Sequence, residues 1–236
     1  MSEQEFIEAL ADIGIVLNVN QIDQFRKYSE YLLEYNTHTN LTAIKTKEEV
    51  YLKHFYDSLL LLKYIQVSGC VLDIGSGAGF PGIPLKIVYP NIDLYLLDSN
   101  GKKTTFLNKL RDIISLDYNV INDRAEKYIE TKRESFDYVV SRAVAPLPVL
   151  AELSIPFVKV GGFFIAYKAQ YEIEVEESKF AISTLGATIQ KVESTTLYTR
   201  NDNRAFIIIN KKCKTEIKYP RPFEKISKKP LQNLQK

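Results

Sequence analysis

Apolar residues in the first quarter of the chain recur with the period of a helix. Phe6 and Leu10 share one side of a first predicted helix, and a second helical pattern begins after Asn20, whose side chain can cap it. A polar loop at Asn36–Ile44 precedes a further predicted helix at about Lys47–Tyr64. The pattern therefore predicts an all-helical amino-terminal part.

From Cys70 onward, short apolar runs alternate with amphipathic stretches. This alternation predicts a mostly parallel, doubly wound sheet with right-handed crossovers. The predicted strands are Cys70–Ile74, Asp93–Leu97, Tyr118–Asn122, Phe136–Ser141 and Phe163–Lys168, and the predicted helices between them are Phe80–Tyr89, Lys102–Ile114, Ala125–Thr131 and Pro148–Val158. After a helix at about Ile173–Leu185, two sequential strands at Thr188–Glu193 and Ala205–Asn210 predict a C-terminal antiparallel hairpin. Gly161 and Gly162 predict a tight turn into the fifth strand.

Charge is distributed unevenly along the chain. The formal net charge is +2, but residues 211–236 hold nine lysines and arginines against two glutamates, so this segment carries +7 and the rest −5. A basic end favours a polyanionic partner, although a solvated, partly disordered end would have the same composition. We therefore expect a helical cap at 1–68, an α/β core at 69–210 and a basic tail at 211–236.

Composition narrows the class of protein. The 236 residues, 45% hydrophobic and 25% charged, suit one globular α/β domain with a short extension. No run of eighteen apolar residues occurs, and the first ten residues carry acid where a signal peptide carries Lys or Arg. We therefore expect a cytoplasmic protein with no membrane partner. Two cysteines without a CxxC pair, and two histidines, predict no metal site.

The most informative segment reads VLDIGSGAGFPG and includes the end of the first predicted strand. A buried strand that runs into several glycines and then a helix brings bare backbone N–H groups close to a ligand. Two templates fit it. The dinucleotide pattern GxGxxG begins at Gly77, whereas the methyltransferase pattern DxGxGxG runs from Asp73 to Gly79.

The position of the strand favours the methyltransferase pattern. Gly75 follows Ile74 directly, as the first glycine of such a pattern should, whereas Gly77 lies three residues after the strand. The Asp73 carboxylate would also repel a dinucleotide pyrophosphate, but it is compatible with a cationic sulfonium cofactor. A mostly parallel sheet that ends in a hairpin is likewise typical of class I methyltransferases.

Charged residues also follow the next three predicted strands. Asp98 ends the second strand, where a carboxylate can accept the ribose hydroxyls of an adenosine or cap the following helix. Glu126 follows the third strand, where a loop can meet the adenine edge, and Arg124 can instead pair with it at the surface. Arg142 leaves the fourth strand at the carboxyl edge of the sheet, where it must reach an anion, an acceptor or a structural carboxylate.

Taken together, these segments resemble the small-subunit (16S) ribosomal RNA guanine-N7 methyltransferases, also called the glucose-inhibited division protein B family, over about residues 36–231. The continuation Phe80-Pro-Gly-Ile-Pro84 is much more specific than the glycine pattern alone. The matching segments are Asn40–Thr42, His54–Ser58, Asp73–Pro84, Leu97–Lys103, Arg124–Glu126, Ser141–Ala143, Tyr219–Arg221 and Lys228–Leu231. The chain departs from the family at Ala78, where a proline is common, and at Pro222–Lys225, where the family has a Pro-Gly step.

The resemblance implies a Rossmann-like class I fold with a helical cap and S-adenosyl-L-methionine as the cofactor. It implies that Gly75, Phe80, Ala125, Glu126 and Arg142 line the cofactor site, with Asp98, Ser99 and Asn100 beside the ribose; Asp73, Gly77 and Gly79 complete the predicted set. It also implies 16S ribosomal RNA or the small ribosomal subunit as partner. We expect a monomer and no binding to DNA.

The implied chemistry needs little from the protein. Guanine N7 carries a lone pair at neutral pH, so attack on a sulfonium methyl requires no general base, and the sequence offers no obvious one. Catalysis is then expected to come from positioning, and the target base must be unpaired to be reached. No catalytic residue is assigned; Arg142 is a positioning candidate that can hold the cofactor carboxylate, a phosphate or guanine O6.

Three alternatives stay open at this point. The glycine pattern also fits an NAD-type oxidoreductase. The chain can be an RNA-binding module that keeps a vestigial pocket. A methyltransferase of this kind can also act on transfer RNA or a small molecule.

Overall fold

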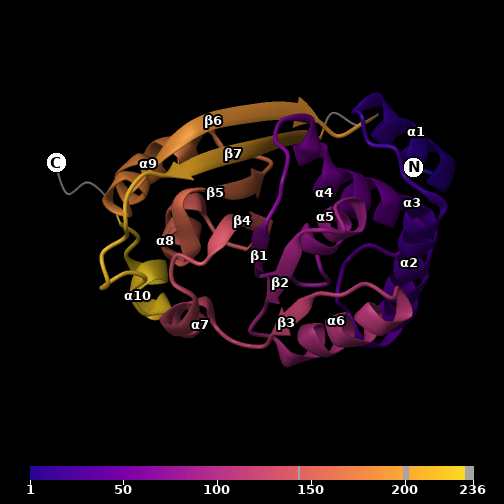
Figure 1. Cartoon of the computed structure of the whole chain (residues 1–236), viewed down its shortest axis with the longest axis horizontal. Helices are drawn as coiled ribbons and strands as arrows, with labels where there is room; N and C mark the ends of the chain where they lie inside the picture. Colours follow the sequence, from indigo (N-terminus) through magenta and orange to yellow (C-terminus); the bar gives the residue numbers. More distant parts are fainter. Residues whose placement is uncertain (143, 199–201, 232–236) are drawn as a thin grey trace.

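A seven-stranded sheet forms the centre of the computed structural model, which describes residues 1–142, 144–198 and 202–231 (Figure 1). The strands are β1 (Cys70–Ile74), β2 (Asp93–Leu97), β3 (Asn119–Ile121), β4 (Phe136–Arg142), β5 (Val158–Lys168), β6 (Ala187–Thr196) and β7 (Asn203–Lys211). Their order is β3-β2-β1-β4-β5-β7-β6. The first five strands run parallel, and β7 is antiparallel to both of its neighbours, which confirms the predicted α/β class and C-terminal hairpin.

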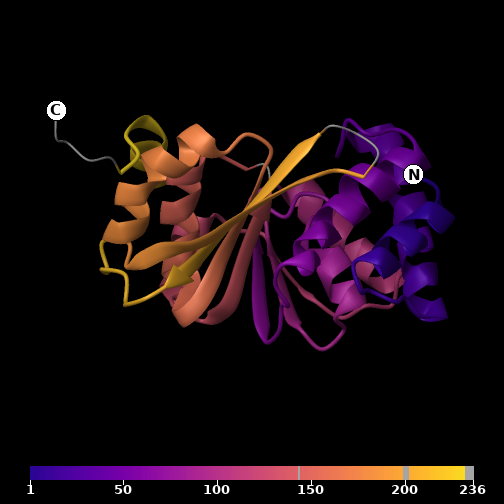
Figure 2. The same ribbon diagram turned by 90° about the horizontal axis from the view of Figure 1, so that it is seen from above.

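Helices cover both faces of this sheet (Figure 2). The amino-terminal helices are α1 (Glu3–Asp12), α2 (Val19–Thr39), α3 (Lys47–Glu49), the π-helical η1 (Val50–Tyr56), α4 (Asp57–Leu59) and the 3-10 helix η2 (Leu60–Lys63). Those that follow are α5 (Gly82–Val88), α6 (Gly101–Ile113), α7 (Ala125–Lys132), α8 (Leu147–Ser154), the 3-10 helix η3 (Ile155–Phe157), α9 (Glu172–Thr184) and α10 (Phe223–Lys228). No helix in the described part of the chain is both long and apolar enough to cross a membrane.

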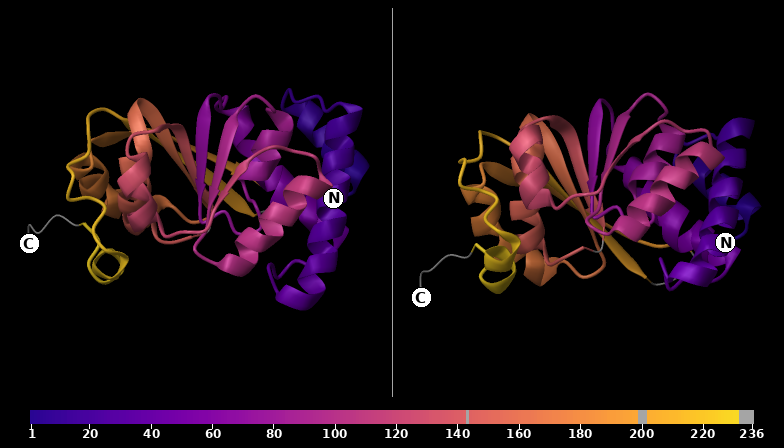
Figure 3. Two further views of the ribbon diagram at one scale, coloured as in Figure 1. Left: turned by 60° about the horizontal axis from the view of Figure 1, so that its bottom comes forward. Right: turned by 90° about the horizontal axis from the view of Figure 1, so that it is seen from below.

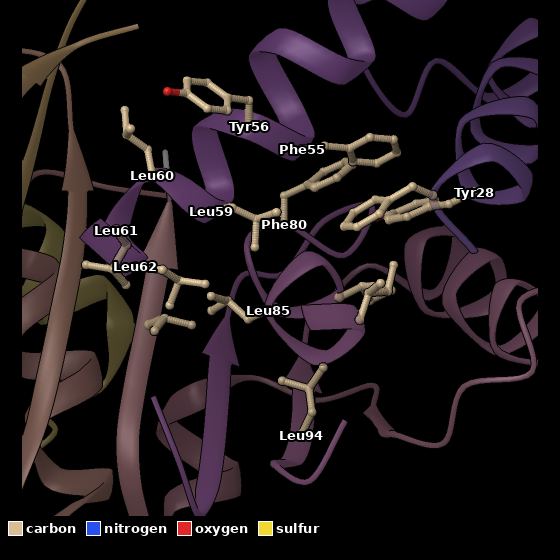
Figure 4. Packing of buried hydrophobic residues seen from close by; sticks show 14 of the residues in the cluster. Tyr28, Phe55, Tyr56, Leu59, Leu60, Leu61, Leu62, Phe80, Leu85 and Leu94 are labelled. Atoms are coloured by element: carbon tan, nitrogen blue, oxygen red, sulfur yellow. The ribbon is translucent and has the colours of Figure 1, made fainter. Parts of the chain in front are cut away.

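Alternation along the strands divides the core into two clusters. Successive strand side chains point to opposite faces, so Val71 and Leu72, both fully buried, belong to different clusters. The Val71 side joins the sheet to α5, α6 and the amino-terminal helices; there the rings of Tyr28, Phe55 and Phe80 lie together (Figure 4). The Leu72 side joins it to α7, α8 and α9. Both faces of β1 are therefore dry, which explains why its sequence is a continuous apolar run.

The amino-terminal helices pack directly on the α/β core. Side-chain amides of α2 donate to main-chain carbonyls there: Gln21 Nε2 to Ile87 O at 2.7 Å and Gln24 Nε2 to Ile114 O at 3.0 Å. These bonds are buried, so each amide satisfies an acceptor that would otherwise lie without a partner at the end of α5 or α6. They fix α2 against these two helices.

Three local predictions were wrong. Asn18, not Asn20, caps α2: its Oδ1 accepts from Gln21 N, and Gln21 Oε1 accepts from Asn18 N. The helix then continues to Thr39, with Leu33 and Tyr35 partly buried against the core, and takes up the start of the predicted polar loop. Gly161–Gly162 lies within β5 rather than in a turn before it, since β5 begins at Val158 with a shift of register against β4.

The predicted basic tail is partly internal. Lys211 ends β7 and is 1% exposed; its Nζ donates to Ile155 O at 2.9 Å and Thr215 Oγ1 at 2.7 Å. It therefore cannot contact a nucleic-acid phosphate, which corrects the expectation for this one residue. Lys236 falls outside the described residues.

Candidate functional site

A pocket lies at the carboxyl edge of the sheet, where ligands bind in open parallel sheets. Its volume is about 350 Å³. The residues that line it come from the ends of β1 and β2, from α6, from the loop before α7 and the start of that helix, from the chain after β4, from α8 and from α10. They are Ile74, Gly75, Leu97, Asp98, Ser99, Lys103, Asp123, Arg124, Ala125, Glu126, Val144, Leu153 and Phe223. Five of the predicted site residues are among them.

The glycine turn after β1 is held against the end of β2. Gly75 N and Ser76 N both donate to Leu97 O, at 2.8 and 3.2 Å. Gly75, Gly77 and Gly79 all have positive φ, at 69°, 60° and 101°. A Cβ on Gly75 would overlap a methyl group of Val144, whereas a Cβ on Gly77 would meet little but open space. Glycine is therefore required at Gly75 for both conformation and close packing.

Asp98 links this turn to the next loop. Its Oδ2 accepts from Gly77 N and its Oδ1 from Asn100 N, both at 2.9 Å, and Lys103 Nζ lies 3.6 Å from Oδ2. The alternative that Asp98 caps the following helix is wrong, because Asn100 caps α6 by accepting from Lys102 N. A carboxylate has about four acceptor sites, so Asp98 keeps capacity for a ligand at the pocket.

Asp73 does not line the pocket; it is buried beneath the glycine turn and binds the main chain at the start of α5. It is fully buried, its Oδ2 accepts from Gly82 N at 2.8 Å, and its Oδ1 has no hydrogen-bond partner within the described chain. Burial raises the pKa of this carboxyl to about 7, against smaller opposing effects of the Gly82 N–H and the Arg142 charge. The carboxyl is therefore partly protonated at neutral pH, and its observed role is to hold the glycine turn to α5.

The loop after β3 forms the opposite wall. Ala125 and Glu126 begin α7 and border the pocket, with Asp123 and Arg124 before them. Arg124 and Glu126 also form the ion pair considered from the sequence, at 3.7 Å. Since the Arg124 side chain is 59% exposed, this pair is weak and leaves Glu126 able to contact a ligand.

Phe80 and Arg142 lie together next to the turn, in a second group of candidate site residues that is separate from the pocket. This group is called the second cluster below and is not one of the two hydrophobic core clusters. The Arg142 guanidinium carbon lies 5.1 Å from the centre of the Phe80 ring. Its Nη1 donates to Lys53 O and to Asp57 Oδ2, both at 3.2 Å. Asp57 in turn accepts from Arg204 Nε at 2.7 Å. Arg142 therefore has the structural carboxylate partner that the sequence left open.

His54 completes this second cluster. Its ring stacks on Phe80 at 4.3 Å between centres, its Nδ1 lies 3.1 Å from Arg142 Nη2, and its Nε2 lies 3.0 Å from Thr42 Oγ1. Because arginine only donates, Nδ1 must be the acceptor, so Nε2 carries the proton. Burial, aided by the Arg142 charge, lowers the pKa of His54 to about 3, so the ring is neutral.

The structure thus separates the predicted site residues into groups. Gly75, Asp98, Ser99, Ala125 and Glu126 line the pocket; Gly77, Asn100, Asp73 and Gly79 shape the loops around it; Phe80 and Arg142 belong to the second cluster. Ala143, part of a matching segment, lies outside the described residues.

Sequence reasoning assigned no role to several residues that the structure brings to these two places. His54 and Asp57 lie three residues apart in the segment of η1 and α4, and this helical spacing is a signal that they share a face. Leu153 and Phe223 come from distant parts of the chain, and no local pattern points to them.

The pocket fits an adenosyl cofactor. A carboxylate at the end of β2 suits ribose hydroxyls, and Ala125, Leu153 and Phe223 provide an apolar wall for a flat ring. Gly75 has no side chain to keep a ligand away from the main chain, although the N–H groups of Gly75 and Gly77 already donate to Leu97 O and Asp98 Oδ2.

Comparison with known proteins decides between the two templates that the glycine pattern left open. Residues 21–203 match the family model GidB, rRNA small subunit methyltransferase G. The chain is 46% identical to ribosomal RNA small subunit methyltransferase G of Macrococcus caseolyticus, covering 98% of this chain and 99% of that one. It is 41% identical to the Bacillus subtilis protein of the same name, covering 98% and 100%.

Solved structures show the same fold at low identity. A ribosomal protein L11 methylase from Lactobacillus delbrueckii subsp. bulgaricus aligns with a TM-score of 0.52 at 15% identity, covering 68% of this chain and 79% of that one. A methyltransferase from Pyrococcus furiosus aligns with a TM-score of 0.53 at 17% identity, covering 65% and 81%. With the pocket at the carboxyl edge and nearly full-length relatives, this chain belongs to the rRNA small subunit methyltransferase G family.

Proposed function

We propose that this protein transfers a methyl group from S-adenosyl-L-methionine to N7 of a guanine in 16S ribosomal RNA. The observation that carries the proposal is the nearly full-length identity to proteins named ribosomal RNA small subunit methyltransferase G, together with an intact pocket at the glycine turn. The protein works in the cytoplasm as a monomer, on the RNA itself or on the small ribosomal subunit.

The pocket residues bind and orient the cofactor, which when bound supplies an electrophilic methyl group on a cationic sulfonium. Asp98 accepts hydrogen bonds from the ribose, and Gly75 lets the main chain approach closely. Glu126 accepts from the nucleoside at the opposite wall. The three carboxylates that line the pocket, Asp98, Asp123 and Glu126, outnumber its two cations, Lys103 and Arg124, and this balance suits a cation better than a pyrophosphate.

The second cluster positions the reacting end. Arg142 is held by Asp57, His54 and the Lys53 carbonyl, so little mobility remains to be lost when it contacts a ligand. Its role is to hold the cofactor carboxylate, a phosphate or guanine O6. It does not bond N7, because a donor there would occupy the attacking lone pair.

Methyl transfer to RNA, followed by identification of the product, tests the proposal. The purified protein is incubated with unmodified 16S ribosomal RNA or 30S subunits and methyl-labelled S-adenosylmethionine, and the RNA is digested to nucleosides. The label is expected in 7-methylguanosine, and Asp98→Asn is expected to lose it. Label in another nucleoside, or transfer only to transfer RNA, would overturn the assignment of the substrate.

A further inference from the structure

The C-terminal segment, residues 212–231, packs on the α/β core on the side opposite the amino-terminal helices (Figure 3). Tyr219 and Ile226 are buried in the same cluster as the strands and α8, and Thr215 is buried beside Lys211. Arg133 Nη2 donates to Tyr219 O from the end of α7. This segment, rich in lysine, is therefore fixed to the body of the protein at several points.

One of these points is an ion pair with a buried carboxylate. Glu152 on α8 is fully buried, and its Oε1 accepts from Arg221 N and Nε, both at 2.9 Å, while its Oε2 accepts from Arg221 Nη2 at 2.7 Å. Arg221 Nη2 also donates to Lys229 O at 3.1 Å. A buried carboxylate with three donors from one residue fixes the main chain there as well as the side chain.

Phe223 lies two residues beyond this attachment and borders the pocket. Pro222 between them restricts the backbone, so the position of Phe223 follows from that of Arg221. Figure 1 shows α10, which contains Phe223, beside α7 and α8. With Ala125 and Leu153, the ring forms an apolar part of the wall, and it is still 38% exposed. An aromatic ring left partly exposed at a pocket has surface available for a ligand.

The two sides of the pocket suit different parts of one molecule. Asp98 and Glu126 suit hydroxyl and amino donors, and the wall of Ala125, Leu153 and Phe223 suits a flat apolar face. We propose that Phe223 contacts the purine ring of the adenosyl cofactor and that the C-terminal segment is thereby part of the cofactor site. This inference rests on the proposed function, which supplies the identity of the ligand.

Binding measurements on the purified protein test the proposal without any activity assay. S-Adenosylhomocysteine is titrated into wild type, Phe223→Ala, Phe223→Leu and the control Ile217→Ala by calorimetry. Ile217 is 85% exposed on the same segment and does not border the pocket. Loss of an aromatic contact to a purine should weaken binding by Phe223→Ala about tenfold. Phe223→Leu, which keeps an apolar side chain, should lose less, and Ile217→Ala should bind like wild type.

A second ligand locates the contact on the cofactor. 5′-Methylthioadenosine shares the nucleoside but lacks the amino-acid end, so Phe223→Ala should weaken its binding by the same factor. Unchanged affinity, a loss confined to S-adenosylhomocysteine, or an equal loss in Ile217→Ala would each overturn the assignment of Phe223. Failure of the wild type to bind S-adenosylhomocysteine would instead overturn the proposed function, and this inference with it.

Discussion

His54 and Arg142 illustrate how single residues prepare this site. The neutral imidazole accepts a hydrogen bond from the guanidinium, so Arg142 keeps its full charge while its position is fixed. Asp57, shared with Arg204, provides the counter-charge. The π-helical turn that contains His54 also presents the Lys53 carbonyl to Arg142, an example of the local helical distortion often found at functional sites.

This arrangement predicts an acid-sensitive stability. The unfolded chain binds a proton on His54 near pH 6.5, but the folded protein does so only near pH 3, so unfolding takes up a proton between these values. Stability is therefore fully present above about pH 6.5 and should fall by about 1.4 kcal/mol per pH unit as the pH drops through that window. Urea unfolding of wild type and His54→Asn at pH 7 to 4 measures it.

His54→Asn should remove the contribution of His54 to the fall in unfolding free energy with decreasing pH, because asparagine does not titrate. Its side-chain oxygen still offers an acceptor to Arg142. His38→Asn, at the other and exposed histidine, is the matched control. Equal slopes for wild type and His54→Asn would contradict a neutral, buried imidazole.

Residues whose role depends on local sequence were predicted, and those whose role depends on distant packing were not. The sequence predicts Asp98 at the pocket because this residue directly follows the apolar run of β2, which the hydrophobic pattern locates. The Arg221–Glu152 pair joins residues 69 apart, and the border position of Phe223 follows from that pair. No periodicity or motif encodes such a contact.

At the scale of elements, the glycine turn sets the geometry of the pocket. It lies between β1 and α5, and its N–H groups at Gly75 and Ser76 donate to Leu97 O at the end of β2. The Val144 side chain packs against Gly75. Gly75 differs from other glycines of positive φ because it borders the pocket and has no room for a side chain. Gly161 has a similar φ of 90°, but a Cβ there meets nothing.

This contrast provides a matched pair of substitutions. Gly161→Ala should lower the free energy of unfolding by about 1 to 2 kcal/mol, because it places a side chain at positive φ, and Gly75→Ala should lower it by more, because its Cβ also overlaps Val144. Only Gly75→Ala, which also displaces Val144, should weaken S-adenosylhomocysteine binding, by more than tenfold. Calorimetry and thermal unfolding measure the two effects. Similar affinity in the two variants would show that the turn does not shape the pocket.

The elements best predicted from sequence are those buried on both faces. β1 and β2 have the predicted bounds because continuous apolar runs end abruptly at polar or glycine residues. β5 and β6 are longer than predicted: β5 also contains Val158–Gly162, whose first residue pairs with Phe136 of β4, and β6 also contains Ala187 and Ser194–Thr196, which pair with β7. Strand pairing is a long-range property, so the apolar pattern underestimates such strands.

At the scale of the whole molecule, segments from the two ends of the chain cover opposite faces of one sheet (Figures 1 and 2). The charge asymmetry seen in the sequence is real, but not every charge is available. Lys211 and Arg221 form hydrogen bonds and ion pairs inside the protein. Lys225, Lys228 and Lys229 are exposed, on or directly after α10, the helix whose Phe223 borders the pocket. The sequence alone could not separate these two kinds of basic residue, because burial decides between them.

Methylation of ribosomal RNA should therefore be salt-sensitive through the exposed lysines. For a single-stranded target, each phosphate contact contributes about −0.7 to the slope of log affinity against log salt, so replacing Lys225, Lys228 and Lys229 by Gln should make the slope less steep by about 2. Filter binding of 16S ribosomal RNA at salt concentrations from about 50 to about 300 mM measures this slope. The Debye length is about 10 Å at 0.1 M salt, so screening changes strongly over this range. Lys179→Gln, on α9 and paired with Glu176, is a control. A slope that the triple substitution leaves unchanged would remove α10 from the RNA interface.

A crystal structure of the protein grown with saturating S-adenosylhomocysteine tests the central claim most directly. The account predicts the ligand in the pocket between Gly75, Asp98 and Ala125, with its ribose on the Asp98 carboxylate. A ligand bound elsewhere, or a pocket that stays empty at saturating concentration, would contradict the account.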